Sequence, residues 1–308
     1  MITSDDRELL GMPPEQTAVR RSSSVSQALR AIRDDVDLGM AAWELTGLGA
    51  DESLAGTRLL VACDRATRQR AYALAHRVYQ SCGYLPPEAK NGWAVSTHDA
   101  YPQTVTLLVE DAQGHEVATI SLVFDSPAGL PCDEIYAGEL SLLRAQGRLL
   151  VEVTRLAIAE EFSHSKTLLV RLFNFIYIFA RRVRGFDDFV IEVNPRHVNY
   201  YRRLLRFEIA GPERPCPRVL DAPAVLLRLD LSVGDREVLR VAGKGAAAQE
   251  RTLYPYFYTW LEEGAVAEFL ARHQKPMTAE DARYFGLEQA PAISSAILTG
   301  ADTSAAAD

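Results

Sequence analysis

Two apolar, β-branched runs separated by one helical segment limit most strongly what this chain can fold into. The first run covers residues 151–158 and the second covers residues 189–193. A long apolar segment with helical character, residues 167–180, lies between them, and another helix is expected at residues 198–206. Charged and polar side chains gather where the two runs end, which is where an α/β sheet commonly holds a ligand. The pattern predicts two neighbouring strands with a ligand site between them.

Other periodic segments extend this sheet. A strand is expected at residues 57–63 and a helix at residues 65–81. A hairpin follows, with strands at residues 105–109 and 117–124. A short helix is expected at residues 134–146 and a final strand at residues 224–231. The hairpin is indicated by the turn sequence of residues 111–114, which ends in glycine. Together these elements predict an α/β (α+β) fold, a mixed twisted sheet flanked by helices on both faces.

Composition divides the chain into four parts. Residues 1–56 are an N-terminal extension that is partly disordered or helical, and residues 57–233 are the main domain. Residues 234–290 are a helical C-terminal extension, and residues 291–308 are a disordered tail. In the first part, residues 25–48 have near-helical apolar spacing. In the third, residues 250–271 are aromatic and predicted to be helical, and residues 277–286 predict one more short helix.

Charge and cysteine usage exclude several classes of protein. The chain has 308 residues and a formal net charge of -8, which argues against general nucleic-acid binding because that requires a basic face. Its four cysteines form no Cys-x-x-Cys pair, so we expect reduced thiols rather than a disulfide framework or a metal site. The acidic N-terminus has no signal-like segment, and Arg171 and Asn174 interrupt the longest apolar run, which is too short to span a bilayer. A cytoplasmic protein with no transmembrane segment is expected.

Glu152 and Arg155 in the first run are the leading candidates for catalysis. On a regular strand their side chains would face opposite sides, because side chains alternate. A β-bulge between them would bring both to one side and free a backbone N–H that can polarise a carbonyl. Glu152 could then accept a proton from an attacking amine. An ion pair at the rim of the sheet is the alternative interpretation.

A polar cluster follows the second run, and Asn194, Arg196 and His197 are candidates for substrate binding. Pro195 keeps Asn194 out of helical geometry, so a helix-start turn that satisfies free N–H groups explains the cluster equally well. Tyr79 and Tyr84, with Tyr72, could line a pocket for an acyl or aromatic group, or belong to the core. A further set of arginines at helix ends suggests docking of an acidic partner, with a solvated face as the alternative: Arg181, Arg182, Arg184, Arg202 and Arg203.

The chain resembles the bacterial N-acyl amino acid synthases, which are similar to the Gcn5-related N-acyltransferases and to the acyl-homoserine lactone synthases. The resemblance covers about residues 57–290, and the segments that carry it are residues 121–136, 152–157, 194–205 and 211–219. It implies transfer of a long acyl chain from acyl carrier protein to the α-amine of an amino acid, tyrosine in the best-known members. The donor would be the acyl-phosphopantetheine of the carrier, with no permanently bound cofactor and no metal.

On matching positions, the resemblance aligns Glu152 and Arg155 with the Glu-x-x-Arg of the autoinducer synthases, and Asp99 with an acidic residue of their amine-substrate site. A backbone amide near Leu156, Ala157 or Ile158 would polarise the thioester.

Two departures limit the resemblance. Ser121 stands where the autoinducer synthases have arginine, which disfavours homoserine-lactone synthesis. Residues 160–167 contain no glycine, although coenzyme A-dependent relatives use a glycine-rich loop there to hold the pyrophosphate. Acyl carrier protein is therefore the preferred donor. A coenzyme A-dependent acetyltransferase and a non-catalytic module that binds an acyl chain or carrier are the alternatives.

Overall fold

The structure is a computed structural model that describes residues 42–45, 54–86 and 92–287. These residues form a nine-stranded sheet in the order β1-β2-β3-β4-β5-β6-β9-β7, and β8 pairs with β9. The strands are β1 (Ala42–Glu44), β2 (Arg58–Val61), β3 (Val105–Glu110), β4 (Glu116–Phe124), β5 (Leu150–Ile158), β6 (Asp188–Val193), β7 (Glu208–Ile209), β8 (Arg214–Cys216) and β9 (Ala222–Asp230). Strands β5 and β6 pair in parallel, whereas the other pairs are antiparallel.

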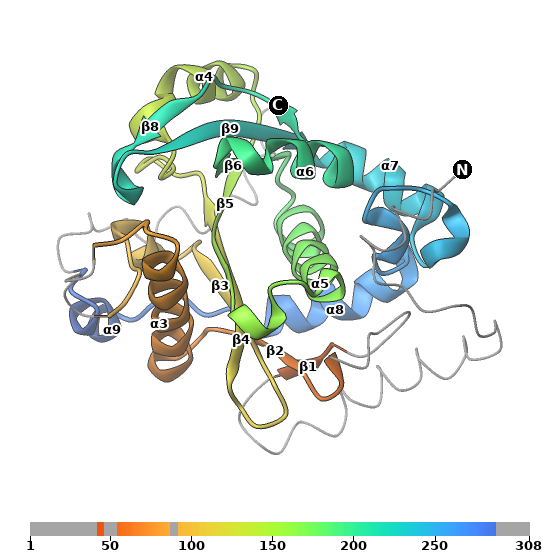
Figure 1. Cartoon of the computed structure of the whole chain (residues 1–308), viewed down its shortest axis with the longest axis horizontal. Helices are drawn as coiled ribbons and strands as arrows, with labels where there is room; N and C mark the ends of the chain where they lie inside the picture. Colours follow the sequence, from red (N-terminus) through yellow and green to blue (C-terminus); the bar gives the residue numbers. More distant parts are fainter. Residues whose placement is uncertain (1–41, 46–53, 87–91, 288–308) are drawn as a thin grey trace, which may run out of the picture.

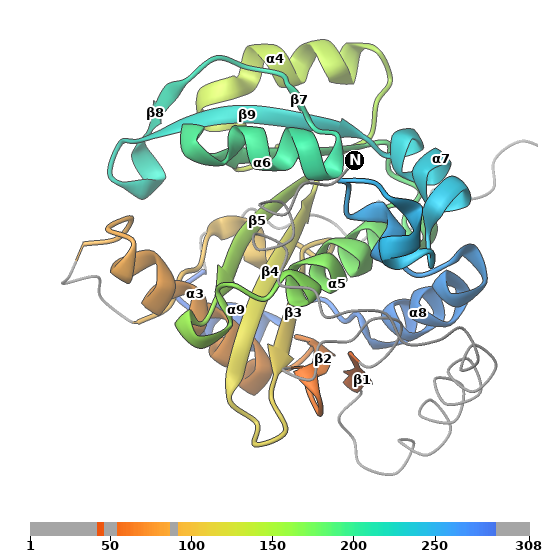
Figure 2. The same cartoon turned by 45° about the vertical axis from the view of Figure 1, so that its right-hand side comes forward.

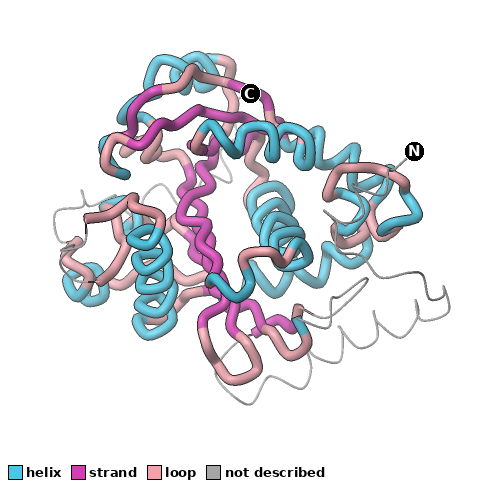
Figure 3. The backbone as a smooth tube through the Cα atoms, viewed as in Figure 1, coloured by secondary structure: helices cyan, strands magenta, loops and turns pink. Residues whose placement is uncertain are grey.

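Helices cover both sides of the sheet, as Figures 1, 2 and 3 show. They are α3 (Arg65–Ser81), α4 (Asp133–Ala145), α5 (Lys166–Tyr177), α6 (Pro195–Leu205), α7 (Leu231–Val241), α8 (Trp260–His273) and α9 (Ala279–Tyr284). The predicted mixed sheet flanked by helices is therefore confirmed, as is a helical C-terminal region. In the described part of the chain, no helix is both long and apolar enough to cross a membrane.

Alternation along the strands explains the two layers. Leu107 and Leu122 belong to the large apolar core that includes α5 and α8, whereas their neighbours Leu108 and Val123 pack in the clusters that include α3 and α4. Successive strand residues point to opposite faces, so α3 and α4 share one face and α5 lies on the other. The central strands are consequently buried on both sides, which is why their sequences are almost continuously apolar.

Side-chain caps fix where the helices next to the central strands begin. Asp64 accepts a hydrogen bond from the Thr67 amide at the start of α3, and Ser165 accepts one from the Leu168 amide at the start of α5. At α6, Asn194 is the N-cap and Pro195 occupies the first turn. This helix therefore starts three residues before the predicted position.

Several sequence-based predictions differ from the structure. The helix expected over residues 25–48 is wrong at Ala42–Glu44, which form a strand paired with β2; residues 25–41 and 46–48 lie outside the described residues. The short strands β7 and β8 were not predicted, and α7, most of which lies in the extension predicted to be helical, was not predicted as a separate helix. The helix predicted over residues 250–271 begins only at Trp260, because Pro255 sits in a short 3-10 turn, Tyr254–Tyr256, that precedes it. The predicted tail, residues 291–308, also lies outside the described residues.

Candidate active site

The two central parallel strands separate immediately after Glu152. Pairing between β5 and β6 runs from Leu150 opposite Asp188 to Glu152 opposite Val190. Beyond Glu152, β5 continues to Ile158 beside β4, with no strand paired to its other edge in the described parts of the chain. In Figures 1 and 2, β5 runs with β4 away from β6 and β9. The separation leaves backbone groups of residues 153–158 on an open strand edge in the middle of the sheet.

The predicted β-bulge is present in β5. Ala157 pairs with Thr119 and Thr154 pairs with Ser121, so Arg155 and Leu156 both lie opposite the one remaining residue of β4. Arg155 has a φ of 52°, in the left-handed region that non-glycine residues seldom adopt. Its guanidinium donates to Ser121 Oγ at 3.3 Å, so the extra residue places the arginine on the α3 and α4 face of the sheet.

Arg155 is held there by a buried carboxylate. Both of its terminal nitrogens donate to Asp99, which lies in the short 3-10 helix Thr97–Ala100, and the two side chains are almost completely buried. The Ser96 amide donates to Asp99 at 2.8 Å, and the guanidinium carbon of Arg155 lies 5.4 Å from the centre of the Tyr72 ring. Burial opposes the charge on Arg155, but Asp99 outweighs it and the pKa of Arg155 is raised.

Glu152 lies on the same face but in a different environment. Its side chain is 2% exposed and accepts a hydrogen bond of 2.8 Å from the backbone N–H of Cys132, directly before α4. Burial, and then the negative charge of Glu192, raise the pKa of Glu152 to about 8, although the hydrogen bonds from Cys132 oppose this rise. A carboxylate with such a pKa can exchange a proton with an amine near neutral pH.

Tyrosines from α3 lie close to the bulge. Tyr79 accepts a hydrogen bond from the Arg155 backbone, and burial is the main cause that raises the pKa of Tyr79 to about 12. The backbone donor freed by the bulge is thus that of Arg155 and is directed at a phenol oxygen. Tyr84 packs edge-on against Tyr79, with ring centres 6.1 Å apart, and its hydroxyl accepts from Arg196 at 3.2 Å. The end of α3 and the start of α6 therefore meet beside the separated strands.

The residues at the start of α6 have clear structural roles. Asn194 Oδ1 accepts from the Arg196 amide at 3.2 Å, which confirms the helix-start interpretation, and Arg196 Nε donates to His197 Nε2 at 3.0 Å. Burial and then the charge of Arg196 lower the pKa of His197, so its imidazole is neutral at pH 7. The role of these three residues in substrate binding stays a prediction.

Leu156, Ala157 and Ile158 contribute their backbone to the open edge of β5. Leu156 and Ile158 direct their side chains into the core on the α5 face, opposite to Glu152, and Ala157 is buried across from Thr119. Polarisation of a thioester by one of their amides stays a prediction.

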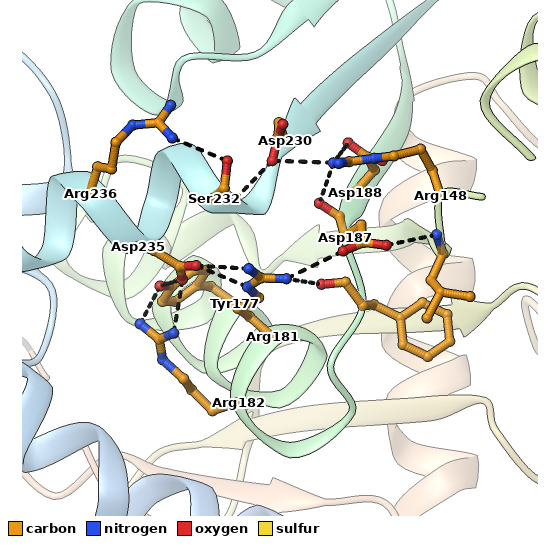
Figure 4. Close-up of polar contacts among 12 residues, drawn as sticks. Arg148, Tyr177, Arg181, Arg182, Asp187, Asp188, Asp230, Ser232, Asp235 and Arg236 are labelled. Carbon is orange, nitrogen blue, oxygen red and sulfur yellow. Dashed lines mark hydrogen bonds and ion pairs between the residues drawn. The ribbon is translucent and has the colours of Figure 1, made fainter. Parts of the chain in front are cut away.

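The five arginines predicted to receive a carrier fall into two groups. Arg181 and Arg182 both pair with Asp235, at 2.9 and 2.8 Å, within the ion-pair network of Figure 4. Arg184 donates to Gln274 at 2.8 Å. By contrast, Arg202 and Arg203 are exposed on α6 and form no ion pair with any residue in the described ranges. Arg184 therefore has a neutral partner and is half-buried, and within this set the α6 pair is the one that presents exposed charge without an ion pair among the described residues.

Sequence reasoning missed four polar neighbours of these residues. Cys132, and Glu192 on β6, interact with Glu152. Arg218, in the turn Pro217–Val219, pairs with Glu192, and Tyr201 on α6 interacts with Tyr79. Glu192 is a glutamate one residue before the end of an otherwise apolar run, residues 189–193, and this pattern could have indicated it. In the part of the chain that the structure describes, no group of three or more His, Cys, Asp or Glu side chains could hold a metal ion.

A mixed sheet whose central parallel strands separate at a buried glutamate has the architecture of a Gcn5-related N-acyltransferase. The family model of the N-acyl amino acid synthase FeeM matches residues 70–230, slightly more than half of the chain. The chain belongs to this family of N-acyl amino acid synthases, and it is an acyltransferase.

One solved structure agrees with this assignment. The structure of FeeM, an N-acyl amino acid synthase from uncultured soil microbes, is 26% identical with a TM-score of 0.50 and covers 57% of this chain and 90% of its own. Two further structures are less similar. The AHL synthase LasI is 13% identical with a TM-score of 0.43, and the match covers 57% of this chain and 90% of LasI. A putative N-acetyltransferase from Lactobacillus plantarum is 16% identical with a TM-score of 0.39, and the match covers 57% of this chain and 99% of that one. No curated protein sequence matches the chain.

Proposed function

We propose that the protein transfers a long acyl chain from acyl carrier protein to the α-amine of an amino acid with a tyrosine-like side chain. The observation that carries this proposal is the separation of β5 from β6 at Glu152, with the bulge at Arg155 three residues further on. It combines an open strand edge, a buried carboxylate and a half-buried phenol in one region of one face.

The open edge of β5 suits the phosphopantetheine arm of the donor. That arm contains two amide groups, and an extended ligand with amides can pair with unpaired backbone groups as an added strand would. Residues 160–167 contain no glycine, so a backbone cradle for the pyrophosphate of coenzyme A is disfavoured and a carrier-bound arm is preferred.

The chemical step joins the amine nitrogen to the thioester carbonyl carbon and breaks the carbon–sulfur bond. Glu152 accepts one proton from the α-ammonium group, which frees the amine lone pair for attack. The nitrogen loses its second proton to the carrier sulfur as the carbon–sulfur bond breaks, so the carrier leaves as the free thiol, and Glu152 later releases its proton to solvent. Charge that develops on the carbonyl oxygen is stabilised by the Tyr79 hydroxyl, which stays protonated because burial raises its pKa to about 12. The products are the acyl-amide and the free carrier thiol.

The acceptor binds beside the bulge in this proposal. Asp99 and Arg155 form a fixed pair of charges, and the rings of Tyr84 and Tyr201 add an aromatic surface close to Tyr79. This pair is closed on itself and holds the bulge in place, and the aromatic side chain of an amino acid can pack on the tyrosines beside it.

Incubation of the purified protein with carrier thioesters of several chain lengths and with each of the common amino acids tests the proposal. We expect acyl-amides by mass spectrometry, with long chains and aromatic amino acids preferred. If acyl-coenzyme A serves as donor at the same rate, the carrier part is wrong. If no amide forms with any donor, the whole proposal is wrong.

Replacing Tyr79 with phenylalanine is expected to lower kcat about 10²-fold, since removal of one donor to a developing oxyanion has effects of this order. The KM for the amino acid should change little. Tyr284→Phe, in the exposed part of α9, is the matched control and should leave kcat unchanged. An unaltered kcat in Tyr79→Phe would remove this residue from the mechanism.

Charge reversal of both Arg202 and Arg203 to glutamate is expected to raise the KM for the carrier about tenfold or more at low salt, with kcat retained. The effect should shrink as salt is added. Arg236→Glu with Arg272→Glu alters the net charge equally at exposed sites on α7 and α8, and should not raise this KM. Equal effects of the two double variants would contradict docking on α6.

A further inference from the structure

A second carboxylate lies on the same face of the sheet as Glu152, on the neighbouring strand. Glu152 is paired in register with Val190, and Glu192 is two residues further along β6, so both side chains point to the α3 and α4 face. The Glu192 side chain is only 11% exposed. The strands separate at this point, so the two glutamates stand at the inner end of the separation, one on each strand.

Arg218 holds Glu192 in this place. It donates to Glu192 Oε2, to the Pro131 carbonyl at 2.7 Å and to Glu134 at 2.5 Å. The other oxygen of Glu192, Oε1, is buried and has no hydrogen-bond partner among the described residues. The arginine therefore neutralises one side of the carboxylate and leaves the other side without a donor.

The groups that face Glu152 come from four elements. Cys132 precedes α4 and donates its backbone N–H, Glu192 comes from β6, Arg218 comes from the turn after β8, and Tyr79 comes from α3. Arg155, on the same strand as Glu152, is committed to Asp99. Glu192 is thus the neighbouring group whose negative charge opposes ionisation of Glu152 most directly.

We propose that Glu192 is a positioning residue for the transfer reaction, holding a second negative charge beside Glu152 so that Glu152 becomes basic enough to take a proton from the amino acid. An ordinary glutamate, with a pKa of about 4, is too weak a base for the α-ammonium group of an amino acid, whose pKa lies several units higher. A more basic Glu152 lowers much of the uphill cost of proton transfer. This inference rests on the proposed function, and it assigns to Glu192 a part that is separate from substrate contact.

Titration of the free protein tests the charge coupling without any turnover. Glutamate carboxyl carbons are labelled with ¹³C, and Glu152→Gln identifies the Glu152 signal. We expect Glu192→Gln to lower the titration midpoint of Glu152 by about one pH unit or more, because a like charge is removed. Glu134→Gln removes a carboxylate that contacts the same arginine but is largely exposed, and should leave the midpoint nearly unchanged.

Rates give the second readout. Below the midpoint, the Glu192→Gln variant should form amide up to about tenfold faster than the unmodified protein, because more Glu152 is ionised. At high pH it should be slower, because its base is weaker, so the two pH profiles cross. If Glu192 had only a structural role, the Glu192→Gln variant would be slower by the same factor at every pH, and the two pH profiles would be parallel.

An unmoved Glu152 midpoint in Glu192→Gln would overturn the inference, as would profiles that are parallel. Should the glutamine variant fail to fold, Glu192→Ala removes the same charge and is expected to move the midpoint in the same direction. A shifted midpoint in a protein that makes no amide would support the coupling and reject the proposed function instead.

Discussion

Substitution of Glu152 by glutamine is expected to reduce kcat for amide formation by about 10²–10⁴-fold, the range typical of a lost general base. Glutamine has nearly the same shape, and its carbonyl oxygen can still accept the hydrogen bond that Cys132 donates at 2.8 Å. The loss should therefore appear in kcat measured with saturating carrier thioester and amino acid. The matched control is Glu160→Gln, an exposed position just after β5, which should keep full activity.

The same variant should also be more stable than the unmodified protein at high pH. Because the folded-state pKa of Glu152 is about 8, above its value in the unfolded chain, folding favours the protonated form. Stability from this group is therefore present at low pH and is lost as pH rises from about 4 through 8. We expect Glu152→Gln to raise Tm by roughly 10 °C at pH 9, with the difference vanishing near pH 4. Lower activity together with lower Tm at pH 9 would indicate damage to the fold instead.

Removal of Asp99 is expected to destabilise the protein by about 3–5 kcal/mol, the range for breaking a buried ion pair. Asp99→Ala leaves the Arg155 guanidinium buried without its carboxylate, in a network whose remaining oxygen acceptor is Ser121. Urea unfolding followed by tryptophan fluorescence measures the change. The Asp99→Ala, Arg155→Met double variant should recover part of the loss, because no uncompensated charge remains buried.

An exposed ion pair provides the control for this prediction. Glu268 and Arg272 lie one turn apart on α8, with side chains 56% and 62% exposed. Glu268→Ala should change the free energy of unfolding by about 0–1 kcal/mol. If Asp99→Ala costs no more than this control, the Asp99–Arg155 pair does not fix the bulge.

Local patterns were sufficient to locate most elements of the sheet and its helices. Helix α3 was predicted with the bounds that it has, because its apolar spacing and Gly83 depend only on nearby residues. The short strand β1 was not predicted, since a three-residue strand has too few positions for alternation to be visible. Helix α7 follows β9 without any loop and begins at Leu231, whereas composition placed the start of the helical extension at residue 234.

The site was only partly predictable for a different reason. A bulge near Arg155 could be anticipated, because Glu152 and Arg155 were needed on one side of a strand, although it consists of Arg155 and Leu156 and does not lie between Glu152 and Arg155. The partner of Arg155 could not be identified from local pattern, because Asp99 is 56 positions away in the chain. Similarly, alternation shows which side of β6 carries Glu192, but its place beside Glu152 depends on the register between two strands.

Phe285, directly after α9, is connected to the bulge in β5 through the ring of Tyr72 on α3. Tyr72 packs edge-on against Phe285, with ring centres 5.2 Å apart, and its other contacts include the Arg155 guanidinium. Asp281 in α9 also pairs with Arg65 and Arg68 at the base of α3. If the proposed site is correct, we expect substitutions in α9, which is remote in sequence, to alter amino acid selectivity. Shortening the protein before Phe285 is expected to destabilise the packing around Tyr72 and Arg155.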